Sequence, residues 1–291
     1  SMVRASEEYL TAEDGVRLLV RSWLPDTSPE QVVLCVHGMS SHSAYFARLG
    51  YCLAKKGCAV YALDLRGNGL SGKPGDAESI DRQIADIHLA VEKIHPSHFS
   101  EPLHLLGHSL GTGYVLRYVH TCSSSVKSVI LLSPAVKTIS NYNTRMLLTM
   151  ATMGFRILLT PHARWDTTVG WPNALRESHL GKMLLTDPAC VKEFTYRYTM
   201  GIMQVSGKAL LRYAASVTLP ALILQGEKDG VVAPEGAQRL YERLAAREKQ
   251  IVMLPDADHD MFGLLLPSDN ELTENARQVV EVIHQWLNRA Q

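Results

Sequence analysis

The strongest constraint on this chain is a serine that lies between two glycines directly after a short apolar run. Residues 103–106 are a candidate buried strand, and residues 107–111 read Gly-His-Ser-Leu-Gly, with Ser109 at the centre. A G-x-S-x-G pattern between a strand and a helix predicts a sharp turn that lifts the serine hydroxyl above the end of a sheet. Glycines permit so tight a turn, and residues 114–119 continue with apolar side chains at helical spacing. We therefore expect Ser109 to be a nucleophile at a strained turn.

Apolar runs and helical patterns alternate along most of the chain. Continuous apolar runs, typical of strands covered on both faces, occupy residues 32–36, 58–65, 103–106, 126–132, 219–225 and 250–254. Helical spacing of apolar residues is found at residues 43–56, 84–94, 234–246 and 271–287. This alternation predicts an α/β protein with a mostly parallel central sheet and helices on both faces. Before it, residues 9–24 alternate around Asp14-Gly15, a turn dipeptide that predicts a β-hairpin.

The alternation stops in the middle of the chain. Residues 134–218 show no clear strand pattern and are rich in methionines and aromatic residues at helical spacing. We expect a helical insertion there, with residues 1–133 and 219–291 forming one core. The plainest interpretation of its apolar stripes is that they pack inward, as in an ordinary helical subdomain.

Two candidate partners for the serine follow later strands. The run 219–225 leads into a loop that carries Asp229, and the run 250–254 leads into a loop that carries His259. Because the carboxyl ends of parallel strands share one edge of a sheet, Ser109, Asp229 and His259 are expected to meet there. His259 would take the serine proton and return it to the leaving group, while Asp229 would orient the histidine ring. The chain order of serine, acid and histidine is the one found in α/β-hydrolases.

Other polar groups near these strand ends are weighed against the same geometry. Three further acids rival Asp229: Asp256, Asp258 and Asp260. They neighbour the histidine in sequence and are badly placed to reach its far nitrogen. The backbone N–H groups of Met39 and Leu110 are the expected oxyanion hole. His37 and His108 lie in strand-end turns, where we expect them to pack or to support the site.

Composition and motif spacing argue against several classes of function. Lysines plus arginines and aspartates plus glutamates both number 29, whereas a nucleic-acid-binding protein normally shows a basic face. The glycine-rich residues 66–72 do not open directly into a helix, as a dinucleotide-binding loop would. No histidine or acidic cluster has metal-ligand spacing, so we expect no metal and no cofactor. An odd number of cysteines, five, indicates buried free thiols, and with no signal peptide or membrane-spanning run we expect a cytoplasmic protein.

Taken together, five motifs resemble the α/β-hydrolase superfamily. They are residues 36–39, 64–71, 107–111 and 226–229 and the segment around His259. The branch that looks most similar is the monoacylglycerol lipase and lysophospholipase-like group, also labelled serine-aminopeptidase-like, and the resemblance covers nearly the whole chain. It implies an α/β-hydrolase fold in which residues 134–218 form the family's lid (cap). That group usually has Gly-His-Gly where this chain has Gly67-Asn68-Gly69.

We therefore predict a serine hydrolase that cleaves carboxylic esters with an apolar acyl group through an acyl-enzyme on Ser109, with monoacylglycerols or related lipids favoured. Flexible lid side chains would form the acyl pocket, and the candidates are Met146, Met150 and Phe155. The lid could also touch a membrane surface transiently. The alternatives are a short-chain or aromatic carboxylesterase, thioesterase or amidase, and a non-catalytic protein that binds a small apolar ligand. No nucleic-acid partner is expected, and the oligomeric state is left open.

Overall fold

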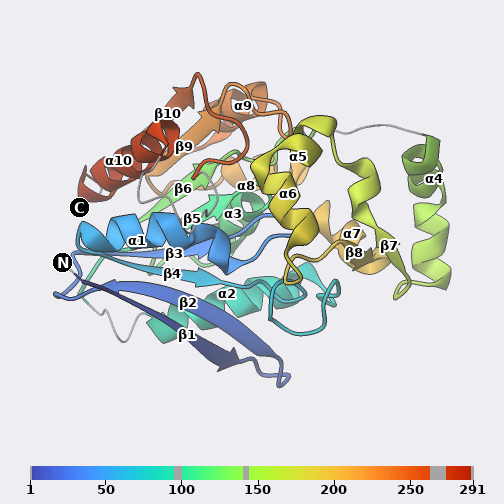
Figure 1. Ribbon diagram of the computed structural model, residues 1–291, viewed down its shortest axis with the longest axis horizontal. Helices are drawn as coiled ribbons and strands as arrows, with labels where there is room; N and C mark the ends of the chain where they lie inside the picture. The colour runs from blue at the N-terminus through green and yellow to red at the C-terminus, as the bar shows by residue number, and fades with distance from the viewer. Residues whose placement is uncertain (1, 95–99, 140–143, 263–272, 290–291) are drawn as a thin grey trace.

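The computed structural model describes residues 2–94, 100–139, 144–262 and 273–289, without the side chains of residues 144–147, 149 and 150. Its centre is one eight-stranded sheet (Figure 1). From edge to edge the strands are β1 (Val3–Thr11), β2 (Arg17–Pro25), β4 (Cys58–Leu63), β3 (Gln31–Val36), β5 (Leu103–His108), β6 (Ser128–Leu132), β9 (Ala221–Gly226) and β10 (Lys249–Leu254). The six strands from β4 to β10 run parallel, and β1 and β2 pair antiparallel. The mostly parallel sheet and the amino-terminal hairpin are confirmed.

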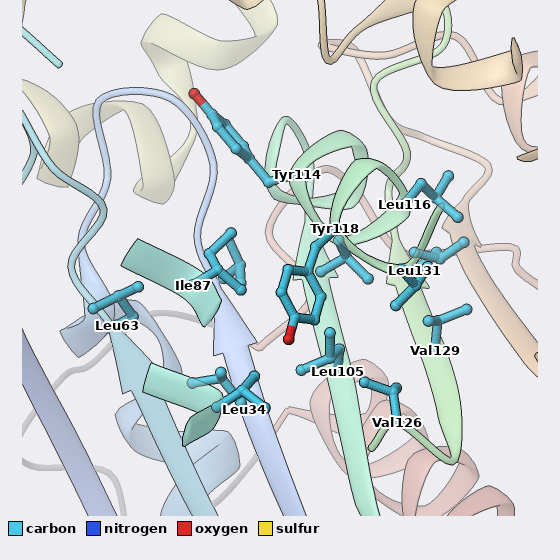
Figure 2. Close-up of a cluster of buried hydrophobic side chains, with 14 of the residues drawn as sticks. Leu34, Leu63, Ile87, Leu105, Tyr114, Leu116, Tyr118, Val126, Val129 and Leu131 are labelled. Carbon is cyan, nitrogen blue, oxygen red and sulfur yellow. The ribbon is translucent and has the colours of Figure 1, made fainter. Parts of the chain in front are cut away.

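Both faces of the sheet are covered by helices. Helices α1 (Ala47–Lys55) and α10 (Glu274–Arg289) lie on one face, and α2 (Ile80–Ile94), α3 (Gly111–Thr121) and α9 (Glu235–Arg243) lie on the other. Alternate residues of β3 show why its sequence is apolar throughout. Leu34 packs into the core beneath α2 and α3 (Figure 2), whereas its neighbours Val33 and Cys35 pack into the core beneath α1 and α10. A strand with no solvent-facing side needs no polar alternation.

Between β6 and β9 the chain leaves the sheet and forms a series of short elements. These are α4 (Thr144–Leu159), β7 (Arg164–Asp166), a 3-10 turn (Thr167–Gly170), α5 (Asn173–Glu177), α6 (His179–Thr186), β8 (Glu193–Thr195), α7 (Tyr196–Ile202) and α8 (Gly207–Ala214). The expectation that this segment holds no strand was wrong, because β7 and β8 pair antiparallel. Strands of three residues are too short to show a period of two in the sequence.

The two ends of this segment differ in their packing. Helix α8 buries Leu210 and Ala214 in the core beneath α2 and α3, so it is part of the layer that covers the sheet. Helix α4 lies at the far edge of the molecule in Figure 1 and exposes apolar side chains to solvent. Phe155 is 68% exposed and Leu158 is 82% exposed. An apolar surface of this kind on a folded protein usually has a partner.

The cysteines are all free, but they are not all buried. Cys35, Cys58 and Cys190 are buried, whereas Cys52 and Cys122 are half-buried, so the expectation of five buried thiols was wrong at two positions. Cys52 lies on α1, which has one face toward solvent, and Cys122 caps the carboxyl end of α3. Among the described residues, no helix combines the length and the apolar character that crossing a membrane requires.

Candidate active site

Ser109 occupies a tight turn between β5 and α3. Its φ of +55° lies in the left-handed region, which a residue with a side chain seldom adopts. The Ser109 N–H donates to the carbonyl of Leu132 at the end of β6, over 2.9 Å, and this bond holds the turn against the neighbouring strand. The predicted sharp turn is thus confirmed, and the surrounding packing maintains its backbone strain.

The two glycines that flank the serine are required by close backbone contacts. A Cβ atom on Gly111 would lie 2.1 Å from the carbonyl oxygen of Val36 in β3, and one on Gly107 would lie 2.6 Å from the backbone of Gly111. Any side chain at either position would therefore push the turn away from the sheet. The G-x-S-x-G spacing therefore lets the start of α3 lie directly against the end of β3.

Ser109, His259 and Asp229 form a continuous line of hydrogen-bonding groups. His259 Nε2 lies 3.0 Å from Ser109 Oγ, and His259 Nδ1 lies 2.8 Å from Asp229 Oδ2. Asp229 follows β9 and His259 follows β10, so the common edge of a parallel sheet brings together residues as far apart as 150 positions in the sequence. Both the acid and the histidine are buried. The first distance is within the reach of direct proton transfer.

Asp229 is held as a carboxylate by several donors. Its Oδ1 accepts hydrogen bonds from the N–H groups of Val231 and Val232, and its Oδ2 accepts from His259 and from Gln225 Nε2 at 3.2 Å. Burial alone would raise the pKa of Asp229, but the charge of His259 and these hydrogen bonds outweigh it and keep the pKa below its usual value of 3.8. The ionised acid fixes the proton on His259 Nδ1, which leaves a lone pair on Nε2 facing the serine.

The three rival acids have other contacts. Asp256 is 76% exposed and pairs with Lys228 at 2.7 Å. Asp258 accepts from the backbone N–H of Asp260, and Asp260 accepts from the Tyr45 hydroxyl at 3.5 Å. In the described part of the chain, the acid that meets the His259 ring is Asp229.

The loop after β3 lies directly against the serine. A Cβ atom on Gly38 would be 3.0 Å from Ser109 Cβ, so a side chain at this position would crowd the serine. His37 fixes the loop, because its Nδ1–H donates to the Gly38 carbonyl at 2.7 Å and its Nε2 accepts from the Leu65 N–H at 3.0 Å. Burial lowers the pKa of His37 to about 4, so the ring stays neutral and keeps both bonds. As expected, His37 supports the site without touching the serine hydroxyl.

This arrangement places two backbone amides near Ser109. Met39 follows Gly38, and Leu110 follows the serine at the first turn of α3. Within the described part of the chain, neither N–H takes part in a hydrogen bond. Unengaged backbone amides are groups that can donate to a negatively charged oxygen.

The structure describes only one of the three expected acyl-binding side chains. Phe155 lies on α4, where its side chain is largely exposed to solvent. Met146 and Met150 belong to the same helix, but their side chains lie outside the described residues. The structure thus joins Ser109, Asp229 and His259.

One cluster near the site could not be seen in the sequence. His42, Asp187 and Cys190 offer metal-ligand atoms within 4.8 Å of one another. His42 Nδ1 accepts from the Ala44 N–H at 3.3 Å, so the proton on Nε2 is the one donated to Asp187 at 2.9 Å. A metal ion at Nε2 would have to displace that proton. The pair already satisfies its own polar groups, and it ties the loop after β3 to the segment that follows α6.

Comparison with known proteins gives the family. Residues 27–263 match the family model described as Serine aminopeptidase, S33. The monoacylglycerol lipase of Mycolicibacterium smegmatis is 27% identical over 267 residues, which cover 89% of this chain and 91% of that protein. The monoglyceride lipase of Mus musculus is 24% identical over 283 residues, which cover 96% and 89% of the two chains.

The fold is shared with a solved structure. A soluble variant of the monoglyceride lipase from Saccharomyces cerevisiae, in complex with a substrate analog, has a TM-score of 0.83 at 20% identity, with coverage of 100% of this chain and 97% of that one. The family model spans most of the sequence. The chain therefore belongs to the serine aminopeptidase family of α/β-hydrolases, in the monoacylglycerol lipase-like branch of carboxylic ester hydrolases.

Proposed function

We propose that this protein hydrolyses monoacylglycerols or related esters of apolar acids through an acyl-enzyme on Ser109. The observation that carries the proposal is the hydrogen-bonded line from Ser109 through His259 to Asp229. A serine hydroxyl is a weak nucleophile at neutral pH and needs a base at this distance. The line supplies that base, and it supplies the acid that orients it.

In the proposed reaction, Ser109 Oγ attacks the ester carbonyl carbon while His259 Nε2 takes the hydroxyl proton. The carbonyl oxygen becomes an oxyanion, which the N–H groups of Met39 and Leu110 stabilise by hydrogen bonding. When this intermediate collapses, the carbon–oxygen bond to the alcohol breaks, and the alcohol leaves with the proton from His259. A water molecule then repeats the sequence on the acyl-enzyme and releases the acid.

Asp229 stabilises the imidazolium that forms on His259 during each step. Its carboxylate receives four hydrogen bonds and remains ionised, so the positive ring faces a fixed negative charge. Loss of that charge would favour the wrong tautomer of the ring. The acid is therefore essential although it does not reach the substrate.

The lipid substrate class is supported by two observations. Two relatives are matched over about nine-tenths of their length, and they are named monoacylglycerol lipase and monoglyceride lipase. Independently, α4 presents exposed apolar side chains at the far edge of the molecule, which suits a surface that meets lipid. We propose that the insertion, residues 134–218, acts as a lid and that α4 contacts lipid aggregates, with Met146, Met150 and Phe155 guiding the acyl chain.

The experiment that tests this function is hydrolysis of 1-monoacylglycerols of rising chain length beside matched soluble short esters, with Ser109→Ala as the blank. A rate maximum at medium or long chains supports the lipase assignment. Activity confined to short esters moves the assignment to a small-ester hydrolase with the same triad. Equal rates for the wild type and Ser109→Ala, together with no labelling by a serine-directed phosphonate, would identify a non-catalytic binding protein.

A further inference from the structure

The residue before the nucleophile makes an unusual contact with the loop that carries the base. The His108 ring is buried, and its Nε2 lies 2.9 Å from the backbone carbonyl oxygen of His259. The two rings are close, with centroids 5.0 Å apart. His108 therefore meets His259 at its main chain, whereas the His259 ring bonds Ser109 and Asp229.

The protonation of His108 follows from this contact. A carbonyl oxygen only accepts, so His108 Nε2 carries a proton and donates it. Burial, and next the charge of neighbouring His259, lowers the pKa of His108 to about 3. The ring is therefore neutral at working pH. It adds no second positive charge beside His259 when that ring is protonated during the reaction.

Aromatic side chains fix the His108 ring in place. Tyr45 packs against it with centroids 4.7 Å apart, and the Tyr45 hydroxyl oxygen lies 3.3 Å from His108 Nε2. The same hydroxyl donates to Asp260, the residue after the base, at 3.5 Å. The Phe262 ring also belongs to this cluster, with its centroid 5.2 Å from the centroid of the Tyr45 ring. Buried rings of this kind allow little reorientation, so the donor stays aimed at the His259 carbonyl.

We propose that His108 is a positioning residue that aligns the His259 base with Ser109 by hydrogen bonding to the His259 main chain. Ser109 and His108 are consecutive residues at the end of β5, so one rigid piece of backbone carries the nucleophile and also holds the loop of the base. A displacement of this strand end moves both partners together. This role rests on the proposed function, because it concerns the proton transfer between His259 and Ser109.

The test is kinetic and uses the full chain. His108→Phe keeps a ring and removes the donor, and we expect kcat to fall about tenfold to a hundredfold with KM changed less than twofold, because small misalignments of reacting groups carry losses of this size. His108→Gln restores an N–H at a similar reach and should recover much of the lost kcat. Rescue by glutamine would not be expected if only the volume of the ring mattered.

A double-mutant cycle separates positioning from a general effect on folding. In a His259→Ala background the base is absent, so His108→Phe should then change the residual rate less than twofold. The matched control is His104→Phe, because His104 is a buried histidine of the same strand whose ring bonds Ser128 and Gln31 at the opposite end. That variant should lower Tm while kcat per folded molecule stays near the wild-type value.

Several outcomes would overturn this role. They are an unchanged kcat in folded His108→Phe, a loss of kcat in His108→Gln as large as that in His108→Phe, a loss in His108→Phe that persists in the His259→Ala background, and a loss of kcat in His104→Phe equal to that in His108→Phe. If His108→Phe does not fold, His108→Gln and His108→Asn decide the question, since asparagine has the donor but not the reach. The proposed function fails separately, when the wild type is no faster than Ser109→Ala.

Discussion

The reactive edge of the sheet and the insertion between β6 and β9 are held in different ways. The sheet edge carries Ser109, Asp229 and His259. There the Asp229 carboxylate accepts four hydrogen bonds, and the Ser109 N–H donates to the adjacent strand β6. In the insertion, α4 exposes Phe155 and Leu158 to solvent. In the function proposed above, the geometry for bond breaking comes from packed parallel strands, and contact with a variable acyl chain falls to a surface that can adapt.

The two regions are nevertheless joined. His42 follows β3 near the serine, and its bond to Asp187 reaches across to the insertion. The Arg197 guanidinium of α7 makes a second link, because it pairs with Asp76 of the loop after β4 at 2.7 Å. The insertion is thus attached to the core by polar links and by apolar side chains of α5, α6 and α8 that are buried in the core, whereas α4 leaves Phe155 and Leu158 exposed.

The largest effect is expected from the acid of the sheet edge. Asp229→Asn keeps the shape but removes the charge that orients His259, so kcat should fall about 10⁴-fold. The matched control is Asp256→Asn, because that exposed acid pairs only with Lys228 among the described residues. Ester hydrolysis measured on both variants checks this. A large loss in Asp256→Asn, or a small one in Asp229→Asn, would contradict the assignment of the acid.

Stability should depend on pH through the buried histidines of the sheet. Burial lowers the pKa of His37 and His104 to about 4 and that of His108 to about 3, from an ordinary value of 6.5. As pH falls below 6.5 the unfolded chain binds protons that the native chain does not, so stability present above pH 6.5 is lost. Each histidine contributes a slope of up to about 1.4 kcal/mol per pH unit.

Urea unfolding at pH 7.5 and pH 5.0 measures this dependence. The free energy of unfolding should be lower at pH 5.0, and His104→Gln should reduce the difference because one titrating group is removed. The lowered pKa of Asp229 acts in another range, since its contribution is present above pH 3.8 and is lost only below that value. Equal stability at the two pH values would show that these rings are not kept neutral by the fold.

An intermediate effect is expected on the insertion. Phe155→Asp and Leu158→Asp should each lower the rate on monoacylglycerols in vesicles about tenfold. The reason is that burying an apolar side chain in the lipid contributes about 1.5 to 3 kcal/mol to binding, which the charged variants lose. The rate on a soluble short ester should not change, since these side chains are exposed. Tyr51→Asp on α1 is a suitable control, being 47% exposed on another element. Equal losses on both substrates would remove the distinction between the two regions.

The smallest effect is expected from the hydrogen bond between His42 and Asp187, which links the sheet edge to the insertion. Asp187→Ala removes the acceptor of the His42 N–H, and a hydrogen bond contributes about 1 kcal/mol, so Tm should fall by about 2 to 4 °C. Calorimetry on Asp187→Ala and on the isosteric Asp187→Asn checks it, since the amide oxygen of asparagine can still accept. A fall of equal size in Asp187→Asn would indicate that charge, not the bond, holds the two regions together.

Much of this fold can be predicted from short segments of the sequence. Apolar runs such as residues 32–36 predict buried strands, and the strand ends together with the chain order were enough to select Ser109, Asp229 and His259. Contacts between distant segments leave no such trace. The bonds from His108 to the His259 carbonyl and from His42 to Asp187 each join residues about 150 positions apart, with no motif spacing between them. The strands β7 and β8 are short and depend on each other for their pairing.

The pairing of β9 with β6 has a consequence for the synthesis of this protein. Ser109 and its strained turn are complete once the first half of the chain is made, but Asp229 and His259 arrive only when β9 and β10 have added to the sheet across the whole insertion. Non-local parallel pairings of this kind form late in folding. In a chain that ends before residue 259, Ser109 therefore lacks the histidine that it contacts in the complete protein.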